Sequence, residues 1–149
     1  MTAQQLLSDY GAYHRDARNK MTHYFGIPMI VFAIQVMLRA VHIPVSGLAL
    51  DGALVVLIPV ALYYLFLAPG LGLVMAVLLA IGYVLAGPLG VWVGVGLFLL
   101  GWVLQFIGHF YEGKKPAFLK NALHLLAGPL FILNQLFLKL GMPGGLKVS

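Results

Sequence analysis

The stretch YGAYHRDARNKMTHYFGIP, residues 10–28, holds two of the five histidines and stands directly before the first long apolar run. A second polar stretch, QFIGHFYEGKKPA at residues 105–117, holds a third histidine and closes an apolar run much later in the chain. Most of the sequence between the two is apolar. We therefore expect these two polar stretches to meet at one membrane surface and to hold a metal ion there.

The composition predicts an all-α integral membrane protein. Of the 149 residues, 62% are hydrophobic and 9% are charged, whereas a soluble domain carries about 25% charged residues. A chain this apolar cannot cover its surface with polar groups, so lipid is its expected solvent. The period-two alternation of a membrane barrel is missing, which favours helices. The length suits a single membrane-embedded domain over residues 1–149.

The formal net charge of +5 does not indicate a nucleic-acid-binding protein. The cations are sparse and stand beside apolar runs, so we expect them to contact anionic lipid headgroups. The chain has no cysteine, which excludes disulfides, iron–sulfur clusters and a thiol nucleophile. The N-terminal residues lack the order of a cleaved signal peptide, so the first apolar segment is expected to remain as an anchor.

Helical periodicity predicts an amphipathic helix over residues 3–19, followed by a bundle of about five hydrophobic spans. Read as one helix, residues 71–107 would be about 55 Å long, far beyond a hydrocarbon core of about 30 Å, so the break at Gly87 and Pro88 is required. Proline and glycine breaks elsewhere divide the remaining apolar sequence. The expected spans cover residues 24–38, 51–67, 71–86, 89–110 and 122–140.

Five crossings sort the charges and the histidines between the two membrane sides. Six of the nine cations fall on the side of the N-terminus: Arg15, Arg18, Lys20, Lys114, Lys115 and Lys120. The excess of cations predicts that this side is cytoplasmic. The same count leaves His42 on the opposite side, where we interpret it as an ordinary interfacial side chain. Four histidines share the cytoplasmic side: His14, His23, His109 and His124.

These four histidines are the candidate metal ligands. Neutral imidazoles with a carboxylate nearby suit iron, zinc, copper or nickel. His14 and His23 are nine residues apart, which at about 100° per residue places them on nearly opposite faces of a straight helix. They can share a metal only if the chain bends, and residues 19–22 are the expected place. Asn19 suits such a corner because asparagine caps helices and tolerates unusual backbone dihedrals.

Four polar residues near the histidines are the candidate catalytic residues. Tyr10 shares a helix face with His14, and Asn19 shares one with His23. In the second stretch Glu112 follows His109 by three residues. Gln105 lies one turn deeper, where it could hydrogen-bond the second ring nitrogen of a metal ligand. The candidate set is therefore Tyr10, Asn19, Gln105 and Glu112.

The two patterns YHRDxxNxxxHxxGxP (residues 13–28) and QFIGHxxExxxPA (residues 105–117) together resemble the family of membrane 2-hydroxy-fatty-acid dioxygenases. The resemblance covers the whole chain in order and spacing, although the middle spans match only as apolar filler. It implies oxidative shortening of a 2-hydroxy fatty acid by one carbon, with O₂ and Fe(II).

By this resemblance, His14, His23 and His109 would bind the iron, and His124 would be a weaker fourth candidate. Three polar side chains would support the ligands: Asn19, Gln105 and Glu112. Family members often carry a glutamate near the C-terminus, where this chain has Asn134 and Gln135. The resemblance implies reduced activity here if that acid matters.

Three other functions compete with this interpretation. A histidine-box hydroxylase or desaturase needs more histidines, in clustered pairs, than the five present. A metal or lipid transporter would carry polar groups near the middle of several spans, and residues 71–104 offer almost none. A non-enzymatic membrane protein that binds lipid or metal stays as the alternative, and in a purely structural protein the histidines would be incidental.

Overall fold

The computed structural model describes residues 1–148, and the predicted all-helical fold is confirmed in them apart from one short hairpin and a 3₁₀ turn, η1 (Ala117–Leu119). The chain forms two compact units. Residues 1–28 and the chain from residue 101 onward make the terminal unit, and residues 29–100 make the middle unit. The helices are α1 (Ala3–Gly11), α2 (Ala17–Arg39), α3 (Gly52–Leu67), α4 (Pro69–Ala86), α5 (Val91–Glu112) and α6 (His124–Lys139).

Within residues 1–148, three helices are long and apolar enough to cross a membrane: α2, α4 and α5. Helix α3 is equally apolar but has 16 residues, which makes it about 24 Å long against a core of about 30 Å. The structure therefore supports three of the five expected spans. Large apolar side chains cover these helices with little shielding, since Phe66 is 85%, Trp92 81% and Phe110 83% exposed.

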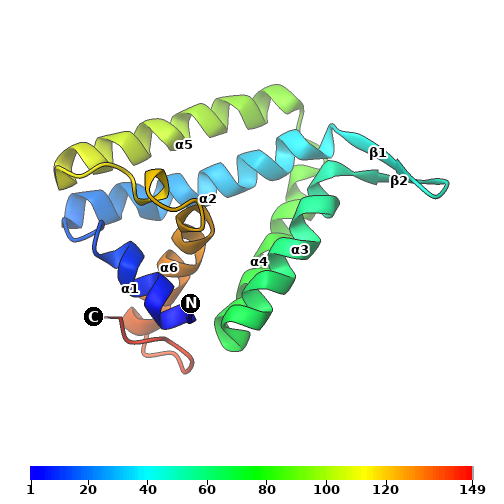
Figure 1. Ribbon diagram of the computed structural model, residues 1–149. Coiled ribbons are helices and arrows are strands. Elements are labelled where there is room, and N and C mark those ends of the chain that lie inside the picture. Colours follow the sequence, from blue (N-terminus) through cyan, green and yellow to red (C-terminus); the bar gives the residue numbers. More distant parts are fainter. Residues whose placement is uncertain (149) are drawn as a thin grey trace. The chain divides into compact units, whose positions relative to one another are not determined.

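The middle unit is built on the helical hairpin of α3 and α4, which run antiparallel (Figure 1). Asp51 caps α3 by accepting a hydrogen bond from the Leu54 backbone N–H at 3.0 Å. The two strands β1 (His42–Val45) and β2 (Leu48–Asp51) precede it as an exposed antiparallel hairpin. Ser46 and Gly47 both have positive φ, as a two-residue type I′ turn requires. The sequence predicted only a break here and missed the strands.

Polar side chains within the middle unit find partners in the same unit. The buried Gln35 donates from Nε2 to the carbonyl oxygen of Leu79 at 2.8 Å. Arg39 donates to the carbonyl of Tyr83 at 2.6 Å, and the Tyr83 hydroxyl donates to Asp51 at 2.5 Å. An unpaired polar group would be costly among these apolar helices, so such bonds stabilise the unit.

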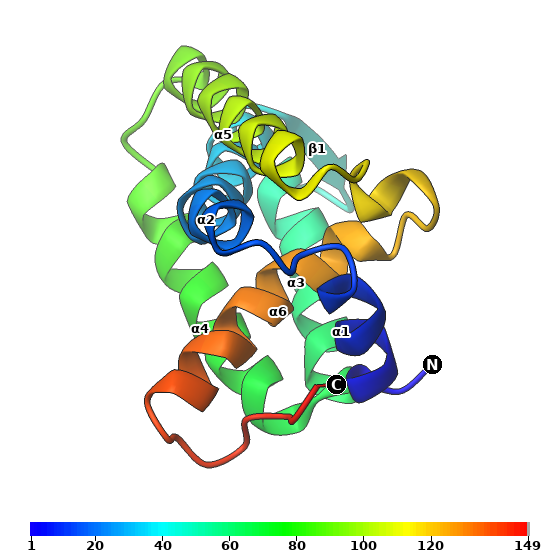
Figure 2. The same ribbon diagram turned by 90° about the vertical axis from the view of Figure 1, so that its left-hand side faces the viewer.

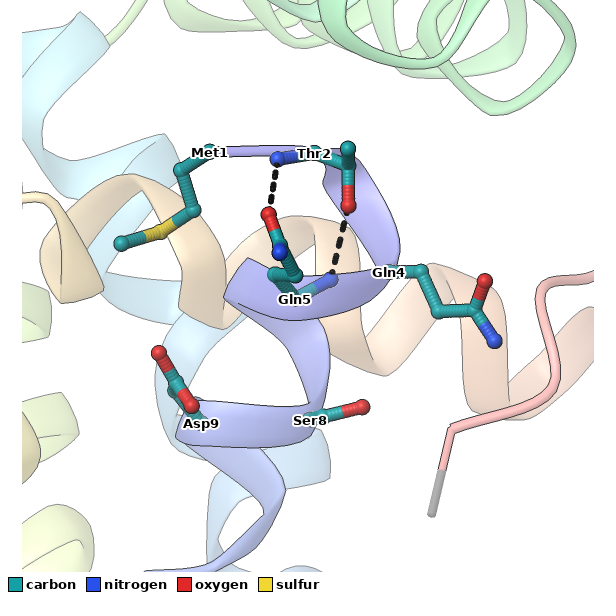
Figure 3. A pocket seen from close by; sticks show the side chains of 6 residues that line it. All are labelled: Met1, Thr2, Gln4, Gln5, Ser8 and Asp9. Carbon is teal, nitrogen blue, oxygen red and sulfur yellow. Dashed lines mark hydrogen bonds between the residues drawn. The ribbon is translucent and has the colours of Figure 1, made fainter.

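The terminal unit begins with a capping box at the start of α1 (Figure 3). Thr2 accepts from the Gln5 N–H at 3.2 Å, and the Gln5 side chain accepts from the Thr2 N–H at 2.8 Å. A surface pocket at this cap contains none of the predicted site residues. Helix α1 buries Leu6, Leu7 and Tyr10 and packs against α6 (Figures 1 and 2).

The expected single helix over residues 3–19 is wrong, because α1 ends at Gly11 and α2 begins at Ala17. Asp16 caps α2 by accepting from the Arg18 N–H at 2.8 Å. The Glu112 carboxylate on α5 accepts from the N–H groups of Arg15 and Asp16 at 2.9 and 2.8 Å. The backbone N–H groups that donate to these carboxylates cannot also form the hydrogen bonds of one continuous helix. The chain therefore turns over residues 12–16.

Candidate metal centre

Three histidines from separate segments of the terminal unit meet in its interior. One ring nitrogen each from His14, His23 and His109 lies within 4.8 Å of the other two, and all three side chains are buried. His14 lies in the turn over residues 12–16, His23 in the second turn of α2 and His109 near the end of α5. The bend that brings His14 to His23 therefore precedes the predicted place at residues 19–22.

Backbone carbonyls hold two of the rings in a defined state. The Nδ1 atom of His14 lies 2.7 Å from the Tyr10 carbonyl oxygen, and that of His23 lies 2.9 Å from the Asn19 carbonyl oxygen. A carbonyl can only accept, so each Nδ1 carries the proton and each Nε2 keeps a free lone pair. These are the tautomers that metal-binding histidines adopt when the other ring nitrogen is held.

The contact between the His14 and His23 rings shows whether these residues fit a metal ion. The Nε2 atoms of His14 and His23 are 3.1 Å apart. With both protons on Nδ1, two lone pairs face each other and repel, unless a cation binds both. The His109 Nδ1 atom is also buried and has no hydrogen-bond partner. These residues fit a divalent transition metal, for which imidazole is a common ligand.

Burial keeps His14 neutral. Loss of hydration lowers the pKa of His14 from 6.5 to about 4. The hydrogen bond to the Tyr10 carbonyl opposes this shift, while the electrostatic effect of His109 reinforces it. His14 is therefore a neutral imidazole at pH 7, which is the form that binds a metal.

Glu112 and Asn19 together fix the turn that carries His14. Besides the two backbone N–H groups of the turn, the Glu112 carboxylate accepts from the Asn19 side-chain amide at 2.9 Å. The same amide donates to the Tyr13 carbonyl at 3.3 Å. Both predicted site residues thus support the turn, and in this arrangement the Glu112 oxygens are occupied by N–H donors.

Tyr10 and His124 adjoin the cluster differently. The Tyr10 ring stacks on the His14 ring, with centroids 4.0 Å apart and planes 10° from parallel. His124 is buried, but it is outside the group of three, and its Nδ1 lies 3.1 Å from the Ala117 carbonyl oxygen. Its ring meets the edge of Tyr10 at 6.1 Å between centroids.

The predicted hydrogen bond from Gln105 to a histidine ring is not among those that the side chains of residues 1–148 form. The Gln105 Nε2 atom is buried and has no hydrogen-bond partner. The carbonyls of Tyr10 and Asn19 take the place that we assigned to it. Tyr10 and Asn19 each lie four residues before the histidine that they contact. The spacing of these pairs in the sequence could therefore have indicated the two contacts.

Gly108 is a close-packed position beside the cluster, and the sequence analysis gave it no role. A Cβ atom added there would lie 2.2 Å from Thr22 Oγ1, 2.4 Å from Asn19 Oδ1 and 3.2 Å from His23 Nδ1. Only a glycine lets α5 approach the start of α2 this closely. Its place directly before His109 was the feature of the sequence that could have indicated this close packing.

Asn134, at the position where the resemblance led us to expect a glutamate, holds the chain near the C-terminus. Its side chain is fully buried, donates to the Leu146 carbonyl at 2.9 Å and accepts from the Leu146 N–H at 2.7 Å. These two bonds fix the end of the chain against α6.

The chain is similar to known proteins over nearly its whole length. The family model described as "2-hydroxy-palmitic acid dioxygenase Mpo1-like" matches residues 1–140. The 2-hydroxy-palmitic acid dioxygenase MPO1 of Saccharomyces cerevisiae is 33% identical over 148 residues, which cover 96% of this chain and 84% of the yeast protein. No solved structure matches.

Proposed function

Because the chain belongs to the Mpo1-like family of 2-hydroxy-palmitic acid dioxygenases, we propose that this dioxygenase-like enzyme shortens 2-hydroxy fatty acids by one carbon, using Fe(II) and O₂. The observation that carries the proposal is the buried cluster of His14, His23 and His109, in which two lone pairs face each other at 3.1 Å. A 2-hydroxy acid and O₂ balance to the shorter acid, CO₂ and water, so no external reductant is required.

In the proposed site the three histidines would hold the iron, and His124 is kept as an outer fourth candidate. The Tyr10 and Asn19 carbonyls orient two of the rings, and Glu112 fixes the turn that carries His14. Bound iron would supply the redox chemistry by which O₂ cleaves the C1–C2 bond. Because the ligands are buried, they would keep water away from the reacting groups.

We further propose that the apolar helices lie in a membrane, with the N-terminus and the metal site at the cytoplasmic face. The exposed apolar side chains and the six cations beside the histidines support this placement. Lipid would then surround the helices and deliver the fatty acid from the side. The chain has no native cysteine, so a single cysteine at Lys114 would report the side, and labelling from outside intact cells would contradict the orientation.

The enzymatic proposal is tested on the protein purified in detergent and loaded with Fe(II) under anaerobic conditions. After O₂ is admitted, 2-hydroxypalmitic acid should be converted to the acid one carbon shorter with matching O₂ uptake. Palmitic acid, which lacks the 2-hydroxyl, is the control substrate. A protein that bound no iron and made no shorter acid would contradict the proposal and favour a non-enzymatic role in lipid binding.

The metal-free protein should lose stability in acid because of His14. Its pKa is 6.5 when unfolded and about 4 when folded, so between these values only the unfolded chain takes up the proton. The contribution of His14 to stability is therefore fully present above pH 6.5 and decreases as the pH drops toward 4, with about 2 kcal/mol of it lost between pH 7 and pH 5. Denaturation at the two pH values measures this loss. The His14→Gln variant should lack this part of the dependence, and an equal loss in both proteins would contradict the assignment.

A further inference from the structure

Among the buried amide side chains of residues 1–148, Gln105 is the exception in its NH₂ group, whereas the unpartnered amide atom of Asn19 is its oxygen. The NH₂ groups of Asn19, Gln35 and Asn134 all donate to oxygen atoms within the protein, at 2.8 to 3.3 Å. Gln105 is only 5% exposed, yet its Nε2 has no acceptor. A buried donor without a partner destabilises a protein, so such a group calls for an acceptor that arrives from outside.

The position of Gln105 places that missing acceptor beside the histidine cluster. Gln105 lies four residues before His109, on the same face of α5 and one helical turn away. Gly26 lies three residues after His23 on α2, and a Cβ atom added there would be 2.2 Å from Gln105 Nε2. The amide therefore lies where α2 and α5 meet, one turn from the ligands and deeper within both helices.

The chemistry of this position requires a hydrogen-bond acceptor. An amide NH₂ group only donates, so its partner must accept. The cations Arg15, Lys114 and Lys120 are exposed on the surface of the terminal unit. At the buried position the donor is instead the neutral amide of Gln105. A carboxylate accepts strongly from such a donor, and a divalent metal one turn away would offset its charge.

From these observations, and on the premise of the proposed function, we propose that Gln105 Nε2 binds the carboxylate of the 2-hydroxy acid and fixes its head group against the three histidines. The apolar Leu104, whose Cβ lies beside Gly26 at this position, suits the start of the acyl chain. Gln105 is thus a residue that binds substrate and has no part in holding the metal.

The test uses Gln105→Met, which keeps the side-chain length and removes the donor. Calorimetric titration of the Fe(II)-loaded protein without O₂ measures binding in the absence of turnover. We expect the Kd of 2-hydroxypalmitic acid and that of palmitic acid to rise by the same factor, about 10- to 100-fold. The amount of iron bound per chain and the midpoint of thermal unfolding should not fall, because the substitution removes an unsatisfied donor.

Gln35→Met is the matched control, since Gln35 is a buried glutamine whose NH₂ group already donates to Leu79. This variant should lower the thermal midpoint and leave both Kd values unchanged. An unchanged Kd in Gln105→Met, with binding intact in the wild type, would overturn the inference alone. Weakening confined to the hydroxylated acid would overturn the carboxylate assignment. A wild-type protein that bound neither acid would overturn the proposed function and this inference with it.

Discussion

Alanine in place of His14, His23 or His109, one at a time, is expected to leave the protein without bound iron and without turnover of a 2-hydroxy acid. Each substitution removes one of three ring nitrogens that lie within 4.8 Å of one another. The loss should exceed the roughly 10- to 100-fold that removal of a supporting residue costs a metal site. Iron per chain, measured after anaerobic loading and desalting, is the first readout, and conversion of 2-hydroxypalmitic acid is the second.

His42→Ala is the matched control for these three variants. His42 lies on the exposed strand β1 of the middle unit, outside the cluster, so its loss should change neither iron content nor turnover. His124→Ala decides whether a fourth histidine contributes, since full retention of iron would limit the site to three ligands. Equal tolerance of alanine at His14, His23, His109 and His42 would mean that the cluster holds no functional metal.

Alanine at Gly108 is expected to damage the same site without touching a ligand. The added methyl group would lie 2.2 Å from Thr22 Oγ1 and 2.4 Å from Asn19 Oδ1. Neither atom yields easily, because Thr22 donates to the Asn19 carbonyl at 2.8 Å and the Asn19 amide is bound to Glu112. The start of α2 must move away from α5, which should cost about 1–3 kcal/mol of stability. Because His23 moves with α2, iron affinity should fall about 10- to 100-fold.

Gly96→Ala on the same helix separates crowding from helix propensity. A Cβ atom at Gly96 would meet nothing within 4 Å, so alanine there should stabilise α5 by up to about 1 kcal/mol. Chemical denaturation in detergent and competitive iron titration measure the two effects. A Gly108→Ala protein with the stability and iron affinity of Gly96→Ala would show that close packing at Gly108 is not required.

The helical class and most of the helix boundaries were accessible from composition and local breaks. The spans predicted at residues 51–67 and 71–86 agree closely with α3 and α4, because Pro69 and Gly87 interrupt apolar sequence in ways that depend on nearby residues alone. The hairpin of β1 and β2 was missed because its eight strand residues are few and mostly exposed. Such a segment gives no clear alternation of apolar and polar positions.

The site was predictable in its members more than in its geometry. Histidine spacing and the two motifs pointed to His14, His23 and His109. The turn over residues 12–16 was not predictable, because the Glu112 carboxylate that binds Arg15 and Asp16 comes from about 96 positions further along the chain. Periodicity reports only neighbours within a few turns, so it continued the first helix through a place where a distant carboxylate ends it.

Composition and motifs were enough to show that the chain is helical and apolar, which residues could bind a metal, and to which family the chain belongs. How these residues act depends on the folded arrangement. In the fold, the Nε2 atoms of His14 and His23 lie face to face, and Glu112 and Asn19 hydrogen-bond within the turn over residues 12–16. Gln105 Nε2 is buried without an acceptor. Hydrogen bonds and close packing depend on distances of a few ångströms between segments. Those distances exist only once α2 and α5 have come together over Gly108 within the terminal unit.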